Sequence, residues 1–262
     1  MQQRSLLTAI VTTSLIAGLV GLRAQTPVQP NSTPQRPQSR AVLVELFTSE
    51  GCSSCPPADA LLRSIDGKHT DSGQLIVGIS EHVTYWNQLG WSDPFSDEAY
   101  TERQNAYGTR FGLDSVYTPQ IVINGEEQIV GSDGASLLRA VQKEARRPQL
   151  DIHIASASIS DNVLTVDFSM DGDVPKKGVD VFAVLAEDAT SSNVLRGENG
   201  GRTLSHVSVA RTITRVASFE NIERTNRPHP SCYLSCNSAQ PRPSSHPLRS
   251  DRGFGIGARG RY

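Results

Sequence analysis

The sequence predicts an α/β fold, with a mixed sheet, flanking helices and a small β-rich region after them. Two apolar runs of strand length, residues 41–47 and 75–79, flank a helical pattern, which is the spacing of a βαβ unit with parallel strands. Between residues 150 and 219 the apolar side chains instead alternate with polar ones, as they do in half-buried strands. The 262 residues leave room for one large domain or two small ones.

The N-terminus has the anatomy of a secretory signal peptide, which we assign to residues 1–24. Arg4 precedes an uncharged, largely apolar stretch at residues 6–22, and a cleavage site follows Ala24. The alternative is an uncleaved membrane anchor, because this stretch is at the short end of what spans a bilayer. Under both hypotheses the rest of the chain is periplasmic or secreted, and disulfides persist in those compartments.

Two segments lack the pattern of a folded core. Residues 25–40 contain four prolines and no apolar periodicity, which is typical of an extended linker. Residues 222–262 contain seven arginines and five prolines, and we expect this tail to be disordered. Its abrupt change of composition is the basis of a further hypothesis, that the reading frame of the source gene is shifted there.

Residues 41–149 are expected to form the first domain, in the order strand, helix, strand, helix, strand, strand, helix. The helix of the βαβ unit comes first, and Ser96 is a favourable start for the second helix. Asn124 and Gly125 form the strongest short hairpin signal between two apolar strands. Asp133 is the expected cap of the third helix.

Residues 150–221 are expected to form a β-rich domain or a β extension of the first domain. The alternating segments that predict its strands are residues 151–154, 164–168, 179–184 and 207–210.

Cys52 and Cys55 form a CxxC motif between a buried strand and a helix start. The unpaired N–H groups of a helix N-terminus favour a thiolate, which is the reactive form of cysteine. Cys52 would stand exposed as the nucleophile, and Cys55, one turn further, would resolve the mixed disulfide. The alternatives are a static local disulfide or half of a metal site; a four-thiolate zinc site with Cys232 and Cys236 has little support, because those two lie in the Pro/Ser/Arg-rich tail.

At these motifs the chain resembles the thioredoxin-like superfamily. The strand VLVELFT, the CSSC at a helix start and the hairpin YTPQIVINGEEQIVG stand in the order and approximate spacing of that fold's core. More narrowly, ELFTSEGCSSCPPAD, SEHVTYWNQLGWSDPFS, VYTPQIVINGE and RGENGGRTLSHV resemble a family of predicted secreted bacterial proteins, domain of unknown function 1223, over about residues 41–215. That family implies no established substrate.

The superfamily resemblance implies roles for three further residues. It implies that Pro119 follows a cis peptide bond and faces the CxxC, and that the backbone of Thr118 is presented to an extended substrate peptide. It also implies that Glu45 is a buried acid able to exchange a proton with the inner thiol, with a raised pKa in an apolar strand. The alternative for Glu45 is a solvated position at the edge of the sheet.

Residues 80–95 interrupt the regular elements and follow the second strand. Loops at the carboxyl ends of parallel strands border the ligand crevice of an α/β sheet, so Trp86 and Trp91 are candidates for a substrate-binding wall. They could equally pack the insertion onto the core. His82 is a candidate for stabilising a thiolate or contacting substrate, although a single histidine more often does neither. Residues 196–206 read as a polar, Gly-rich turn or as a loop that folds back toward the cysteines.

These patterns favour an exported thiol–disulfide oxidoreductase that exchanges disulfides with a protein partner through Cys52 and Cys55. One alternative is a non-catalytic binding module with a structural disulfide, and another is a copper chaperone that uses the cysteines and His82. No Gly-rich phosphate loop appears, so we expect no organic cofactor. The net charge of -2 indicates no nucleic-acid partner, and membrane contact only through an uncleaved N-terminal anchor.

Overall fold

The structure is a computed structural model that describes residues 40–160, 163–172, 178–219, 231–234 and 252–260. The predicted signal peptide, nearly all of the predicted linker and most of the predicted tail lie outside these residues, as do the side chains of Cys232 and Cys236. No helix in the described part of the chain is both long enough and apolar enough to cross a membrane.

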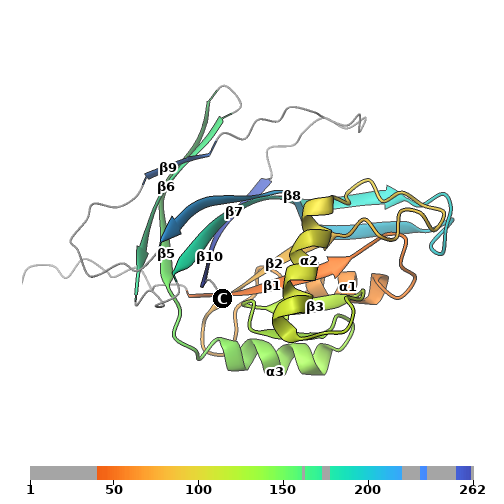
Figure 1. The fold of residues 1–262 in the computed structure, drawn as a ribbon, viewed down its shortest axis with the longest axis horizontal. Coiled ribbons are helices and arrows are strands. Elements are labelled where there is room, and N and C mark those ends of the chain that lie inside the picture. The colour runs from red at the N-terminus through yellow and green to blue at the C-terminus, as the bar shows by residue number, and fades with distance from the viewer. Residues whose placement is uncertain (1–39, 161–162, 173–177, 220–230, 235–251, 261–262) are drawn as a thin grey trace, which may run out of the picture. The chain divides into compact units, whose positions relative to one another are not determined.

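The first part of the chain folds as strands and helices in the predicted order (Figure 1). The elements are β1 (Ala41–Thr48), α1 (Pro56–Ile65), β2 (Leu75–His82), α2 (Glu98–Phe111), β3 (Gln120–Ile123), β4 (Glu127–Val130) and α3 (Gly134–Glu144). Strands alone follow, namely β5 (Asp151–Ser160), β6 (Val163–Asp171), β7 (Val179–Asn193), β8 (Thr203–Phe219), β9 (Ser231–Leu234) and β10 (Arg252–Gly260). The predicted class, a mixed sheet with flanking helices followed by a β-rich region, is confirmed.

The main sheet has the strand order β10-β7-β8-β2-β1-β3-β4, and a second sheet has the order β5-β6-β9. Strands β1 and β2 are parallel and in register from Ala41 with Leu75 to Thr48 with His82. Strand β3 is antiparallel to β1 on its other side. Strand β8 meets β2 at one bridge, between Ser80 and Val209, so the main sheet continues into the later strands.

The helices cover both faces of the first strands. Alternate residues of β1, among them Val44 and Leu46, pack with apolar residues of α1 and α3. The intervening residues face α2 instead, where Phe47 packs against Tyr107. The two faces of β1 therefore pack against different helices. Only the face that carries Val44 and Leu46 packs against α1, the helix that follows the cysteines.

Local sequence signals account for the element boundaries. Asn124 and Gly125 both have positive φ, at 47° and 67°, as the predicted two-residue hairpin turn requires. The Asp133 carboxylate accepts from the Ser136 N–H at the start of α3, as predicted. The cap of α2 is Asp97 rather than the predicted Ser96, because the Ser96 hydroxyl instead donates to the carbonyl of Asp93.

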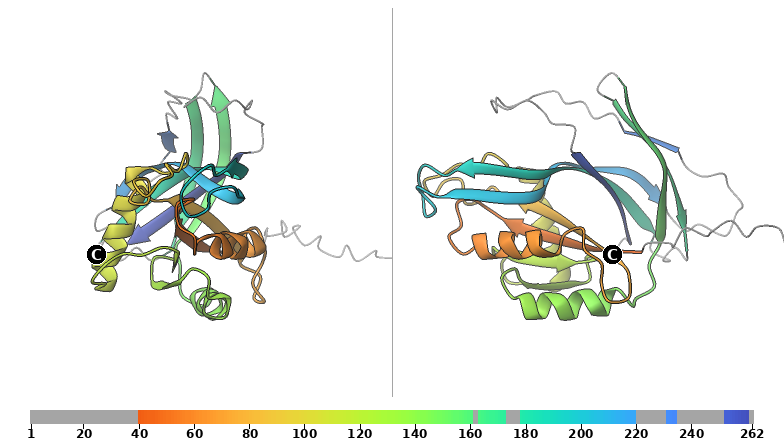
Figure 2. Two further views of the ribbon diagram at one scale, coloured as in Figure 1. Left: turned by 90° about the vertical axis from the view of Figure 1, so that its right-hand side faces the viewer. Right: turned by 180° about the vertical axis from the view of Figure 1, so that it is seen from behind.

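Strands β7 and β8 form a long hairpin whose tip reaches the loop between β1 and α1. The pairing runs from Val179 with Phe219 to Asn193 with Thr203. Both views show the cyan tip of this hairpin beside the orange loop that follows β1 (Figures 1 and 2). A segment distant in sequence thereby becomes part of the surroundings of the CxxC.

Candidate functional site

The CxxC lies in the loop between β1 and α1 and is closed by a disulfide. The Cα atoms of Cys52 and Cys55 are 5.4 Å apart, and Cys55 is the N-cap residue of α1. Pro56 begins the helix, where its missing N–H removes no helical hydrogen bond. The sulfurs therefore sit at the positive end of the α1 dipole, as predicted.

Both cysteines are fully buried, with 0% of their surface exposed. This corrects the expectation that Cys52 stands exposed in its loop; only Ser53 and Ser54, between the cysteines, are exposed. Two neighbouring segments close in on the loop. A Cβ on Gly51 would lie 3.0 Å from the Cβ of Trp86, and the tip of the β7–β8 hairpin holds the other side.

The tip of the hairpin is attached to the CxxC loop by three hydrogen bonds. The Asn199 amide donates to the carbonyls of Glu50 (2.9 Å) and Cys52 (3.0 Å), and Asn199 is fully buried. The exposed carboxylate of Glu198 accepts from the Ser53 N–H (3.0 Å). Of the two readings of residues 196–206, a loop that folds back toward the cysteines is therefore the one observed.

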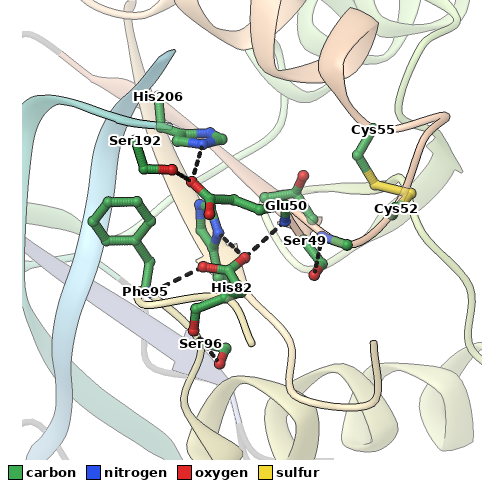
Figure 3. Close-up of polar contacts among 12 residues, drawn as sticks. Ser49, Glu50, Cys52, Cys55, His82, Phe95, Ser96, Ser192 and His206 are labelled. Atoms are coloured by element: carbon green, nitrogen blue, oxygen red, sulfur yellow. Dashed lines mark hydrogen bonds and ion pairs between the residues drawn. A yellow bond between two sulfur atoms is a disulfide. The ribbon is translucent and has the colours of Figure 1, made fainter. Parts of the chain in front are cut away.

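Glu50, two residues before Cys52, is bonded at every polar atom, and Figure 3 shows the contacts of its carboxylate with Ser192 and His206. Its N–H donates to Asp93 (2.8 Å), and its carbonyl accepts from Asn199. One carboxylate oxygen accepts from the indole N–H of Trp91 (2.8 Å), and the other accepts from Ser192 and lies 3.3 Å from Nε2 of His206. A buried carboxylate needs this degree of pairing, because its desolvation is costly.

His206, on β8, links Glu50 to an acid of helix α1. Its Nδ1 lies 3.6 Å from the Asp59 carboxylate, a close ion pair rather than a direct hydrogen bond. Burial lowers the pKa of His206, but its interactions with the carboxylates of Asp59 and Glu50 outweigh burial and raise the pKa to about 9. His206 is therefore an imidazolium between two carboxylates at neutral pH.

Asp59 is the acidic group closest along the helix to Cys55. Its N–H donates to the Cys55 carbonyl (3.1 Å) in the first turn of α1, so the two side chains lie on one helix face. Its carboxylate also accepts from the hydroxyl of Thr48 (3.1 Å). The charged chain of Asp59, His206 and Glu50 thus runs from the first turn of α1 to the residue two before Cys52.

His82 belongs to the same buried cluster but contacts neither cysteine through any recorded bond. Its Nδ1 lies 2.7 Å from the Asp93 carboxylate, and its ring stands edge-on to His206 at 4.7 Å between centroids. Burial raises the pKa of Asp93, but the interactions with His82 and the hydrogen bonds from the backbone N–H groups of Glu50 and Phe95 together lower it by more, so Asp93 is ionised and accepts from Nδ1. Nε2 of His82 is buried without a hydrogen-bond partner.

Trp86 and Trp91, the predicted wall of a substrate site, are half buried, and the indole N–H of each donates a hydrogen bond. Trp86 donates to the hydroxyl of Thr118 (2.8 Å), which ties the insertion to the proline loop. Trp91 donates to Glu50, as described above. The peptide bond between Thr118 and Pro119 is cis, as the resemblance implied, and Pro119 is buried beside Gly131.

Glu45 is fully buried, so its alternative position at a solvated edge is wrong. Its carboxylate lies on the α2 face of β1, where Arg103 binds it at 2.6 Å and Tyr107 donates to it. Burial lowers the pKa of Arg103, but the carboxylates of Glu45 and Glu81 raise it by more. This face is opposite to α1, the helix that follows the cysteines, so the position does not bring Glu45 to the inner thiol.

Five residues of this site escaped the sequence reasoning: Glu50, Asp59, Asp93, Asn199 and His206. Glu50 and Asp59 had a usable signal, since each is a charged residue within four positions of a cysteine. The other three had none, because only the tertiary fold brings β8 and the insertion to the CxxC. Among the described residues no group of three potential ligands has the geometry to hold a metal ion.

Fold and site together define an α/β protein with a disulfide-bonded CxxC at a helix start, backed by a buried acid–histidine cluster. The chain belongs to the family described as protein of unknown function DUF1223, which matches residues 43–237. It is similar to the crystal structure of a protein from Agrobacterium tumefaciens, a structural-genomics target, at 27% sequence identity and a TM-score of 0.55. That alignment covers 74% of this chain and 78% of the other. No curated protein matches.

Proposed function

We propose that this protein is an exported thiol–disulfide oxidoreductase of thioredoxin-like architecture, with Cys52 and Cys55 as its redox pair. The observation that carries the proposal is the disulfide at the N-cap of α1 with a buried, charged acid–base chain beside it. A purely structural disulfide does not require the charged groups of Asp59, His206 and Glu50 beside it. Burying such groups costs free energy unless they are paired. The cis Pro119 loop, tied to Trp86, adds the element that such domains use to align a peptide.

The reaction exchanges one disulfide for another. In the reduced protein the Cys52 thiolate attacks a sulfur of the partner's disulfide, that bond breaks, and one partner thiolate leaves. Cys55 then loses its proton and attacks Cys52, which re-forms the Cys52–Cys55 bond and releases the second partner thiolate. Two electrons pass from the cysteine pair to the partner, and the reverse direction oxidises partner thiols.

Asp59 is the residue we assign to the proton of Cys55. It shares a helix face with Cys55 and is 5% exposed, so a proton that it accepts can pass on to water. Nδ1 of His206 lies 3.6 Å from the same carboxylate. Glu45, on the far face of β1, has no part in this step.

The proposal is tested by trapping each half of the exchange. A Cys55→Ser variant is mixed with a peptide disulfide and should accumulate a mixed disulfide through Cys52, seen by mass. The matched Cys52→Ser variant should trap far less, because its remaining thiol is the inner one. Equal absence of adducts with both variants, in protein that is folded, would contradict the proposal.

One observation favours the second candidate, a binding module with a structural disulfide. Both cysteines are fully buried, and Asn199 fastens their loop to the hairpin tip. For exchange, this tip has to move aside to expose Cys52. The copper-chaperone hypothesis gains no support from the geometry of the described residues.

A further inference from the structure

A shallow pocket of about 170 Å³ lies between α1, from the residue after Cys55 to the last turn of the helix, and the start of β8. Pro56, the residue after Cys55, forms part of its wall, and Asp59 lies one turn deeper. Arg63 from α1 and Arg202 from the hairpin border it, and the remaining lining residues are Thr203, Leu204 and Ser205. The pocket thus adjoins the helix start that carries the disulfide.

The two arginines of this pocket have no acidic partner. Arg63 donates to the carbonyl of Ser205 (2.7 Å), and Arg202 donates to the side-chain carbonyl of Asn199 (2.7 Å). These are neutral acceptors, and neither guanidinium forms an ion pair within the described part of the chain. Each therefore keeps N–H donors and a full charge for a ligand, in the planar geometry that suits a carboxylate.

The acids near the pocket are already engaged. Asp59 is paired with the imidazolium of His206 beneath it, and Glu198 accepts from the N–H of Ser53. The two arginines are the charges that the pocket leaves uncompensated. An arriving anion meets them beside the helix that Cys55 caps, with Arg63 in the last turn of that helix.

We infer that this pocket binds the carboxylate of a thiol or disulfide substrate. In such a substrate the carboxylate is a few bonds from the reacting sulfur. The inference rests on the proposed function and adds a substrate class to it. Arg63 and Arg202 hold the carboxylate, and the substrate's sulfur is thereby placed at the disulfide. In the reductive direction one substrate thiolate breaks the Cys52–Cys55 bond and forms a mixed disulfide; a second thiolate displaces the protein sulfur, so two thiols are oxidised and two cysteines reduced.

The test compares two small thiols that differ in charge. Mercaptoacetate carries the carboxylate and mercaptoethanol carries a hydroxyl in its place, and the rate at which each reduces the Cys52–Cys55 disulfide is measured by thiol trapping. We expect an Arg63→Gln/Arg202→Gln double variant to lower the ratio of the mercaptoacetate rate to the mercaptoethanol rate about five- to tenfold, because a general effect on the loop through Asn199 acts on both rates alike. The difference in intrinsic reactivity between the two thiols cancels when the wild type and the double variant are compared, because both proteins are treated with the same two thiols.

The control is Arg215→Gln, an exposed arginine on β8 that lies nine positions past His206, about 30 Å along an extended strand. It should leave both rates unchanged. Equal losses for both thiols, or no loss in the double variant, would overturn the carboxylate site. If neither thiol reduces the disulfide, the proposed function fails instead.

A binding measurement decides the inference independently of any reaction. The oxidised protein is titrated with acetate, and the NMR signals of residues 202–205 are followed. Saturable shifts that disappear in the double variant support the site. An absence of saturable shifts in the wild-type protein overturns it whatever the redox results are.

Discussion

The side-chain amide of Asn199 donates to the main-chain carbonyl of Cys52 over 3.0 Å, although 147 positions separate the two residues. The same amide nitrogen also donates to the carbonyl of Glu50. A single side chain at the hairpin tip thus satisfies two carbonyls of buried residues in the loop that leads to the disulfide. The position of the CxxC therefore depends on the later strands as well as on β1 and α1.

Replacing Asn199 by alanine should destabilise the protein and loosen the CxxC loop. The Glu50 carbonyl loses its donor, whereas the Cys52 carbonyl still accepts from the Cys55 N–H (3.2 Å), and an unsatisfied buried group costs about 1–3 kcal/mol, so we expect a loss of about 1–3 kcal/mol in the free energy of unfolding. Urea unfolding measures it, and dithiothreitol should reduce the disulfide faster. Asn193→Ala, an exposed residue on the same hairpin, is the matched control and should cost less than about 0.5 kcal/mol. Equal costs for the two substitutions would refute the role of Asn199 as a clamp.

His206 should make the stability of the protein depend on pH in the alkaline range. Its pKa in the folded protein, about 9, lies above the ordinary value of 6.5, so its contribution is complete below pH 6.5 and is lost as the pH rises through 9. The contribution is on the order of 3 kcal/mol. The difference in unfolding free energy between wild type and His206→Gln should therefore shrink from about pH 6.5 to about pH 9. A constant difference across this range would show that His206 is not a cation held by Asp59 and Glu50.

Asp59→Asn should slow the step in which Cys55 resolves a mixed disulfide. Without the carboxylate, the Cys55 thiol loses its proton acceptor. General-base catalysis typically contributes about 100- to 10,000-fold, so we expect the step to be slower by at least about tenfold. The rate of decay of a preformed Cys52 mixed disulfide measures this. Glu45→Gln is the control, since Glu45 lies on the other face of β1. If the mixed disulfide decays more slowly in Glu45→Gln and at the normal rate in Asp59→Asn, then Glu45, not Asp59, accepts the proton of Cys55.

The buried pair of Glu45 and Arg103 should matter for stability and not for exchange. Removing one partner leaves the other charge buried without compensation, so Arg103→Met should cost about 3–5 kcal/mol. Guanidinium unfolding checks this value. Lys143→Ala breaks a surface pair with Glu127 and should cost less than about 1 kcal/mol. If Arg103→Met costs as little as Lys143→Ala, the buried pair does not hold β1 to α2 as described.

Local signals predicted most of the helices and strands between residues 41 and 149 correctly, because such signals act over a few residues. The turn at Asn124 and Gly125 needs only two backbones that tolerate positive φ, and Asp133 needs only its own helix start. The cap at Asp97 was missed by one position, since Ser96 was already used by Asp93.

The partners of the cysteines could not be predicted in this way. His206 reaches Glu50 across 156 positions, and the alternating pattern of β8 gives no sign that this strand extends the first sheet. The superfamily resemblance points to Glu45, which precedes the CxxC in an apolar strand, and it points to no role for Asp59. Which face of β1 each residue occupies depends on where α1 and α2 pack, and that is a tertiary property.

The most direct test of the central claim is an equilibrium redox titration of Cys52 and Cys55 against glutathione, read by mass after thiol trapping. If the pair exchanges disulfides, it should titrate reversibly with a midpoint between about -120 and -270 mV, the range of known oxidoreductases. A pair that stays oxidised below about -300 mV would contradict the account and make the disulfide a structural one.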